Sequence, residues 1–277
     1  MISTESTTSS VSDLRESECL DCGGSIEQRK HEGGFWLPRI CVTCDATVIE
    51  RFKLQETERA RGAFLRRLSC SGMPVDFFDG ARGLDAFAWT PEQASVRDAL
   101  RRFGANELGK PFVMIEGPAG VGKTTLCRCA MTEWARKGHN VREIPAPDLG
   151  LIIRDSYKRD SDLSEREIIE DLRRVPLLLI DDFGAERATT FVTNALFAVI
   201  DGRYRRKAPT LITTNCSVRE LADRLVESSG DQLVAERLID RLIESSHLVR
   251  LNGKSHRLRL AKQAQRWRVP PVETAAP

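Results

Sequence analysis

The chain has 277 residues, of which 41% are hydrophobic, and carries 42 Lys and Arg against 40 Asp and Glu. This length can bury one sizeable core and leave room for a small second module. The net charge of +2 excludes a globally basic nucleic-acid-coating protein, although local basic patches remain open. No apolar run approaches the roughly 20 residues that span a bilayer, and the amino terminus lacks a basic start and an apolar core. We expect a cytoplasmic protein with no membrane partner.

A Ser/Thr-rich, disordered tail is expected over 1–16 and a small zinc-binding module over 17–47. The module contains two CxxC pairs separated by 18 residues: Cys19, Cys22, Cys41 and Cys44. Four thiolates at this spacing can hold one tetrahedral zinc ion, which contributes about 10–16 kcal/mol in finger peptides too small to fold on their own core. A redox dithiol pair and disulfides are the alternatives. His31, the other candidate ligand nearby, is expected to be solvated.

A charged helical connector is expected over 48–69, ahead of a larger domain over 70–262 and a carboxyl-terminal tail over 263–277. Residues 50–68 carry six basic and three acidic side chains. This pattern is typical of a solvated helix, and the alternative is a basic surface for a partner.

The segment 117–124, GPAGVGKT, fits the P-loop pattern GxxxxGK[ST] and lies between an apolar run and a helix-like stretch that begins at Thr125. Glycines let backbone N–H groups crowd around phosphates, while the lysine reaches the outer phosphates and the hydroxyl ligates Mg²⁺. A glycine turn with an idle lysine is the alternative. We expect ATP or GTP to contact Gly117, Pro118, Ala119, Gly120, Val121, Gly122, Lys123, Thr124 and Thr125.

Five apolar runs predict strands, at 112–116, 141–145, 177–181, 210–214 and 247–251, with helical patterns between them. Alternating strands and helices predict an α/β fold with a parallel sheet covered on both faces. The helix after the P-loop is expected to bury Leu126, Cys129, Ala130 and Trp134 and to stop at Gly138. Its amino terminus would point at the phosphates.

The run at 177–180 ends in two carboxylates, Asp181 and Asp182, which is the Walker B pattern. In a parallel sheet they would reach the same edge as the P-loop. Asp181 would then hold Mg²⁺ together with Thr124, and Asp182 would orient the attacking water. The alternative for these acids is a helix cap.

Six segments follow one another along the chain: CSGMPVDFF (70–78), GPAGVGKTTL (117–126), LLLIDDFGAE (177–186), TLITTN (210–215), AERLIDRL (235–242) and GKSHRLR (253–259). In content and order they resemble the AAA+ ATPases of the DnaC/DnaI/IstB group, the helicase loaders and transposition helper ATPases of bacteria and phages. The resemblance covers roughly 65–260. It implies an AAA+ P-loop NTPase with a five-stranded parallel sheet and a small helical part after it.

The resemblance also implies roles for three further residues. Asn215 takes the sensor 1 position, Arg241 the arginine finger that reaches a neighbouring subunit's nucleotide, and Arg257 the sensor 2 position. Their alternatives are a turn residue, an ion pair with Glu244 and a surface arginine. Arg237 is the second candidate for the finger.

Many AAA+ proteins carry glutamate where this chain has Asp182, whose side chain is one methylene shorter. We therefore expect slow ATP hydrolysis that acts as a switch, with Glu186 as a second nearby carboxylate. The implied cofactors are ATP and Mg²⁺, besides Zn²⁺ in the cysteine module.

The partners implied by the resemblance are a hexameric, DnaB-like replicative helicase, single-stranded DNA and further copies of the chain, which self-associate through the AAA+ domain. DnaI-type loaders resemble this layout, because a cysteine module precedes their ATPase. The alternatives are an IstB-like transposition helper that binds duplex DNA and a transposase, and a nucleotide-dependent adaptor whose module binds only protein. Two basic clusters could contact phosphates or be solvated: Lys158 and Arg159, and Arg203, Arg205, Arg206 and Lys207.

Overall fold

A computed structural model describes residues 14–20, 22–29, 41–74, 77, 82–157, 164–184, 189–229 and 231–259. The chain divides into two compact units, Met1–Gly62 and Ala63–Pro277, and each is considered by itself. Within the described ranges, no helix has the length and apolar character needed to cross a membrane.

The first unit contains a short antiparallel hairpin of β1 (Leu14–Glu18) and β2 (Ser25–Arg29), in which Leu14 lies opposite Arg29. The disordered tail predicted over 1–16 therefore extends too far, because residues from Leu14 onward pair with β2 through their backbone, which their polar composition does not reveal. The boundary between the two units falls within α1 (Val42–Ser69), the helix that covers all of the predicted connector and begins six residues before it.

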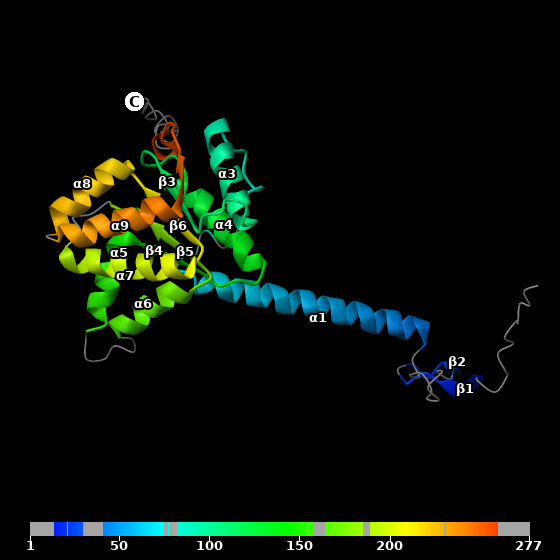
Figure 1. The fold of residues 1–277 in the computed structure, drawn as a ribbon. Coiled ribbons are helices and arrows are strands. Elements are labelled where there is room, and N and C mark those ends of the chain that lie inside the picture. Colours follow the sequence, from blue (N-terminus) through cyan, green and yellow to red (C-terminus); the bar gives the residue numbers. More distant parts are fainter. Residues whose placement is uncertain are drawn as a thin grey trace, which may run out of the picture. The chain divides into compact units, whose positions relative to one another are not determined.

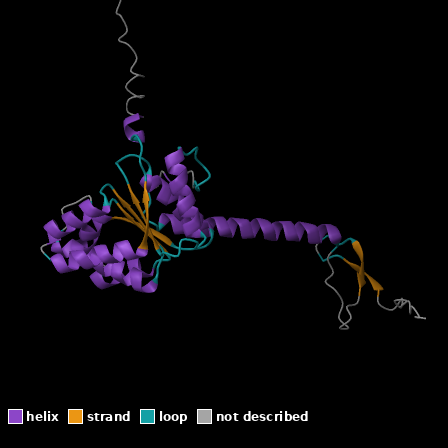
Figure 2. Cartoon of the chain, turned by 45° about the horizontal axis from the view of Figure 1, so that its top comes forward, coloured by secondary structure: helices purple, strands orange, loops and turns teal. Residues whose placement is uncertain are grey.

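The second unit is built on the predicted parallel sheet of five strands (Figures 1 and 2), and their order is β4-β5-β6-β3-β7. Four of them match the expected ranges: β3 (Phe112–Glu116), β4 (Val141–Pro145), β5 (Leu177–Asp181) and β6 (Thr210–Thr214). β7 (Ser246–Arg250) begins one residue earlier than expected. Because all five run in the same direction, their carboxyl ends meet at one edge of the sheet.

Helices cover both faces of the sheet, as buried parallel strands require. One layer contains α3 (Pro91–Gly104) and α4 (Lys123–Arg136). The other contains α5 (Ala146–Asp155), α6 (Glu165–Arg174), α7 (Thr190–Arg206), α8 (Val218–Ser229) and α9 (Gln232–Ser245). Alternate residues of β3 divide between the layers, since Val113 and Ile115 join the core under α4 while Phe112 and Met114 join the core under α7.

The helix α4 connects the sheet to the P-loop. It buries Leu126, Cys129 and Ala130, as predicted. It ends with Gly138 in the left-handed region, at φ +95°, and with a hydrogen bond from the backbone N–H of His139 to the carbonyl of Trp134, which is a Schellman cap. The sequence signals for the end of this helix were therefore read correctly, whereas its first residue is Lys123 rather than Thr125.

Candidate functional site

A cavity of about 480 Å³ opens beside the P-loop at the carboxyl edge of the sheet. Most of the residues predicted for nucleotide chemistry line it together: Ala119, Gly120, Gly122, Lys123, Thr124, Thr125, Asp182, Asn215 and Arg257. They come from the β3–α4 loop, the ends of β5 and β6, and the segment after β7. These nine residues, which lie up to 138 positions apart in the sequence numbering (119 to 257), thus share one site.

The P-loop backbone is shaped by its glycines. Gly120 has φ +79°, and a Cβ at this position would lie 2.2 Å from the hydroxyl oxygen of Ser255. Gly122 has φ +102° and is the residue from which α4 begins. Residues other than glycine rarely adopt these backbone angles, so glycine is required for the turn. The turn directs the N–H groups at the start of α4 into the cavity.

Lys123 is buried, and its ammonium donates to the carbonyls of Gly117 and Pro118 at 2.8 and 2.9 Å and to Oδ1 of Asn215 at 2.8 Å. Burial lowers the pKa of Lys123, while the carboxylates of Asp182 and Asp181 act in the opposite direction. The ammonium is therefore desolvated and held largely by neutral oxygens. Such a cation gains strongly from an incoming phosphate, because little water has to be removed from it.

Asp181, at the end of β5, is joined to the P-loop helix as predicted for a magnesium site. Its Oδ1 accepts from the hydroxyl of Thr124 at 2.8 Å and from the hydroxyl of Thr213 on β6 at 2.5 Å. A hydroxyl and a carboxylate oxygen at this separation are ligands that suit Mg²⁺, a hard cation that prefers oxygen. Thr213 was not predicted from the sequence, although a polar residue in the last positions of an apolar strand is a signal that could have identified it.

Asp182 adopts a left-handed backbone, at φ +52°, directly after the strand. Its N–H donates to the Thr213 hydroxyl at 3.0 Å, and its Oδ1 accepts from Nδ2 of Asn215 at 3.1 Å. Since Asn215 also accepts from Lys123, its amide links the P-loop lysine to the second Walker B acid. A non-glycine residue in this region is uncommon and is found more often at functional sites.

The segment after β7 folds back over the P-loop. The N–H of His256 donates to the carbonyl of Gly120 at 2.9 Å, and Arg257 lines the cavity, as the sensor 2 prediction requires. The ring of His256 also lies 3.0 Å from Nε2 of Gln93, which donates to the carbonyl of Val121 at 2.9 Å. The amino-terminal part of the unit and its carboxyl-terminal segment therefore meet on the loop.

Sequence reasoning missed six residues that line this cavity: Phe87, Ala88, Trp89, Gln93, His256 and Arg259. Thr90 and Gln93 form a capping box at the start of α3, a helix signal that is visible in the sequence. The contact of Gln93 with the P-loop is not visible there, because it depends on how α3 packs.

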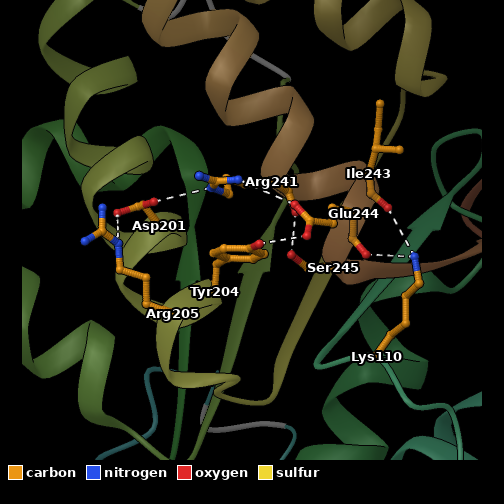
Figure 3. Close-up of polar contacts among 8 residues, drawn as sticks. All are labelled: Lys110, Asp201, Tyr204, Arg205, Arg241, Ile243, Glu244 and Ser245. Carbon is orange, nitrogen blue, oxygen red and sulfur yellow. Dashed lines mark hydrogen bonds and ion pairs between the residues drawn. The ribbon is translucent and has the colours of Figure 1, made fainter.

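Arg241, the predicted finger, lies outside this cavity, on α9 (Figure 3). Its guanidinium is 4.4 Å from the centre of the Tyr204 ring and 3.5 Å from carboxylate oxygens of Asp201 and Glu244. The ion pair with Glu244 that was the alternative reading is therefore present. An arginine that serves a neighbouring subunit would lie away from its own P-loop, so the finger stays a prediction. Arg237 is exposed on the same helix.

One member of the predicted basic clusters is misassigned. Arg203 is fully buried and donates to Thr210 Oγ1 and to the carbonyls of Leu172, Val175 and Pro209 at 2.6–2.9 Å, so it cannot contact DNA. The exposed Arg205 and Arg206 pair with Asp201 and Glu170. Lys158, Arg159, Glu186 and His31 lie outside the described residues.

The first unit brings its four predicted zinc ligands together. The Sγ atoms of Cys19, Cys22, Cys41 and Cys44 all lie within 4.8 Å of one another. Those of Cys22 and Cys41 are 3.7 Å apart, close to the separation of about 3.8 Å expected for two thiolates on one tetrahedral zinc ion. The protonated Cys44 thiol donates to the neighbouring sulfurs of Cys41 and Cys22, which favours its protonated form and raises its pKa. A bound cation would have to displace this proton. The geometry and donor set fit zinc.

Comparison with known proteins relates the ATPase unit to a described family. A family described as IstB-like ATP binding protein matches residues 108–264. A putative ATP-binding protein of an insertion sequence in Mycobacterium tuberculosis is 30% identical over 168 residues, which cover 60% of this chain and 62% of the relative. The replicative helicase loader DnaC of Escherichia coli is 28% identical (60% and 63% covered), and the replicative helicase loader DnaI of Bacillus subtilis is 27% identical (58% and 52% covered). The chain thus matches about half to two thirds of these relatives.

Solved structures share the fold at low identity. The crystal structure of the DnaC helicase loader matches with a TM-score of 0.53 at 22% identity, over 64% of this chain and 99% of that one. The crystal structure of DnaI matches with a TM-score of 0.54 at 22% identity, over 67% and 94%. The predicted AAA+ fold is thereby confirmed.

Proposed function

The chain belongs to the IstB-like ATP-binding protein family, and we propose that it is an ATP-dependent loader of a hexameric, DnaB-like replicative helicase. In this proposal the cysteine module holds zinc and binds the helicase, the AAA+ domains self-associate, and the assembly binds single-stranded DNA. Slow ATP hydrolysis acts as the switch that ends loading.

The observation that carries this proposal is the cluster of four thiols placed in the chain ahead of an ATP site. A zinc-stapled module is rigid and small, and it offers a defined surface for a protein partner without a large core of its own. The similarity to DnaC and DnaI, which are replicative helicase loaders by name, also supports the proposal that this chain is a helicase loader.

We propose the following roles at the ATP site. Lys123 exchanges its neutral carbonyl partners for the outer phosphates, and Thr124 and Asp181 hold Mg²⁺, which neutralises phosphate charge when bound. Asp182 and Asn215, already hydrogen-bonded to each other, orient the water that attacks the γ-phosphate. Arg257 contacts the phosphates from the segment over the P-loop, and Arg241 completes the site of a neighbouring copy.

The switch also follows from this geometry. Asn215 contacts both Lys123 and Asp182, so a ligand that moves the lysine also changes the position of the acid. Binding of the γ-phosphate to the lysine would therefore change the arrangement of the site before any hydrolysis takes place. We infer that nucleotide occupancy, more than rapid turnover, is what partners sense.

A second candidate function is that of an insertion-sequence helper ATPase, which would bind duplex DNA and a transposase. Two findings favour it: the family match itself and the 30% identical insertion-sequence relative.

Complex formation distinguishes the two candidates. The protein is mixed with the replicative helicase of its host, and the mass of the complex is measured by light scattering with ATP, without ATP and with ADP. The same measurement is made on Cys41→Ser/Cys44→Ser, with Cys70→Ser as the matched control, because Cys70 is an exposed thiol outside the cluster.

A stable complex that is lost in the double variant and kept in Cys70→Ser is the expected result. Absence of a complex in every nucleotide state, combined with binding of duplex DNA in preference to single strands, would replace the loader with the insertion-sequence helper.

A further inference from the structure

The ATPase unit contains a second cavity, of about 940 Å³, and among the described residues none lines both this cavity and the nucleotide cavity. It is bounded by the last turns of α1, the edge strand β4, and the helices α5 and α6. We call it the edge groove. Its volume lies toward the upper end of the range of ligand pockets, roughly 300–1,000 Å³, so it has room for several side chains.

The floor of the edge groove is aliphatic. Val141, Ile144 and Leu172 are buried at its base, and Ile152 of α5 is exposed over 37% of its surface. Ile168 and Val175 are partly buried beside them. Covering this floor would remove apolar surface from water, which stabilises a complex in proportion to the area covered.

The rim of the edge groove is basic. Arg66, Arg67, Arg142 and Arg174 line it, against two aspartates, Asp155 and Asp171. Within the described part of the chain, the guanidinium groups of Arg66 and Arg67 have no carboxylate partner, and Arg142 donates to the carbonyl of Cys70. Four arginines against two aspartates leave an excess of two positive charges in one groove, as large as the net charge of the whole chain.

Arg174 adds to this excess. Its partner Glu170 is also within ion-pair distance of Arg173 and Arg206, so one carboxylate serves three guanidinium groups. A carboxylate brought by a partner would therefore meet an arginine whose charge is only partly compensated. Arginine pairs with carboxylates through two parallel hydrogen bonds, which makes such a rim selective for acidic groups.

We propose that the edge groove docks an acidic, amphipathic segment of a partner protein, whose aliphatic side chains cover the floor while its carboxylates pair with the arginine rim. A nucleic-acid strand fits the site less well, because none of the described residues that line it is aromatic and single-stranded nucleic acids are held largely by stacking on aromatic side chains. This surface lies on the ATPase unit and is separate from the cysteine cluster, so it goes beyond the proposed helicase contact.

The test uses the full chain and a fluorescein-labelled peptide of 12 residues with six Glu and four Leu in an amphipathic helical pattern. Anisotropy gives its affinity. Two matched peptides carry Lys in place of Glu or Ser in place of Leu, and a 12-nucleotide oligothymidine serves as the nucleic-acid probe. The protein variants are Arg66→Gln/Arg67→Gln on the rim and Ile152→Asp on the floor, with Arg219→Gln, an exposed arginine of α8, as control.

We expect the Glu/Leu peptide to bind the unaltered protein and both matched peptides to bind more weakly. The rim variant and the floor variant should each raise its Kd by about tenfold, equivalent to about 1.4 kcal/mol, whereas Arg219→Gln should not. Unchanged ATP affinity and Tm would show that the variants are folded. Equal binding of the Glu/Leu and Lys/Leu peptides, or equal affinity across all variants, would overturn the proposal. Oligothymidine binding that alone responds to the rim variant would reassign the groove to nucleic acid.

Discussion

The ion pair between Arg128 of the P-loop helix α4 and Glu143 of β4 provides a stringent test of how the site is supported. The carboxylate accepts from Nε at 2.8 Å and from Nη2 at 2.5 Å, and the exposed fractions of the two side chains are 22% and 2%. Replacing Arg128 by methionine keeps the bulk of the side chain but leaves the buried carboxylate without its cation. Removing one partner of a buried pair costs about 3–5 kcal/mol.

The pH dependence of this loss can be worked out from the structure. Burial already raises the pKa of Glu143, and Arg128 opposes the increase. Without Arg128 the folded-state pKa rises further above the unfolded value, so the folded variant holds more protons than the unfolded chain. Its stability should therefore increase as the pH falls toward the ordinary carboxyl pKa, and the penalty of Arg128→Met should be smaller at pH 5 than at pH 8.

The assay is urea unfolding followed by circular dichroism, with Tm as a second measure. For a unit of this size, about 3 kcal/mol corresponds to a Tm lowered by roughly 6–12 °C. The double variant Arg128→Met/Glu143→Leu removes both charges and should recover most of the loss, since a buried pair replaced by apolar groups of similar volume is often close to neutral. A single variant that loses under about 1 kcal/mol, or a double variant that is less stable than the single one, would refute the reasoning.

Three further predictions concern other parts of the chain. Lys123→Ala should raise the Kd for ATP by about 10- to 100-fold in calorimetry. Because burial lowers the pKa of Lys123, the ATP affinity of the unaltered protein should begin to decline with rising pH below the ordinary lysine pKa, and a flat profile through that pKa would contradict this. Arg203→Met should remove the guanidinium donor from the carbonyls of Leu172, Val175 and Pro209, of which the last keeps the N–H of Leu178 at 3.3 Å, and should lower Tm by roughly 6–12 °C; a change within 1 °C would show that the other two find other donors. Metal analysis should find one zinc per chain, retained in Cys70→Ser and lost in Cys41→Ser/Cys44→Ser, and a chelator should reduce the helicity of the first unit alone.

The sequence predicted those parts of the molecule that depend on local patterns. The P-loop, the Walker B acids and the five strands are each specified within about ten residues, because glycine spacing and apolar runs determine the backbone directly. The clustering of Thr124 with Asp181 followed from the rule that parallel strands end at one edge. The zinc cysteines could be predicted for a similar reason. Each CxxC turn is a local pattern that places two thiols together, and a single contact between the two turns completes the site.

The features that were missed depend on packing between distant segments. Gln93 and His256 are separated by 163 positions, and no local signal indicates that both lie on the P-loop. Arg203 was misread because a run of basic residues at the end of a helix is usually solvated, whereas the rotation of α7 turns this one member inward. A basic helix end with one buried arginine has the same composition as one that is fully solvated, so only the tertiary structure distinguishes them.

The outer edge of β4 has a consequence for how the protein behaves at high concentration. An edge strand with unpaired N–H groups can pair with strands of other molecules. In β4, however, the N–H of Glu143 already donates to the carbonyl of Ser71 at 2.6 Å, and Pro145 has no N–H. Gly72 lies so close that a Cβ on it would be 2.6 Å from the carbonyl oxygen of Glu143, and its φ is +82°. A side chain at position 72 would therefore push this cover away and leave the sheet open to intermolecular pairing. Purified Gly72→Val should accordingly form β-rich aggregates at concentrations where the unaltered protein stays dispersed.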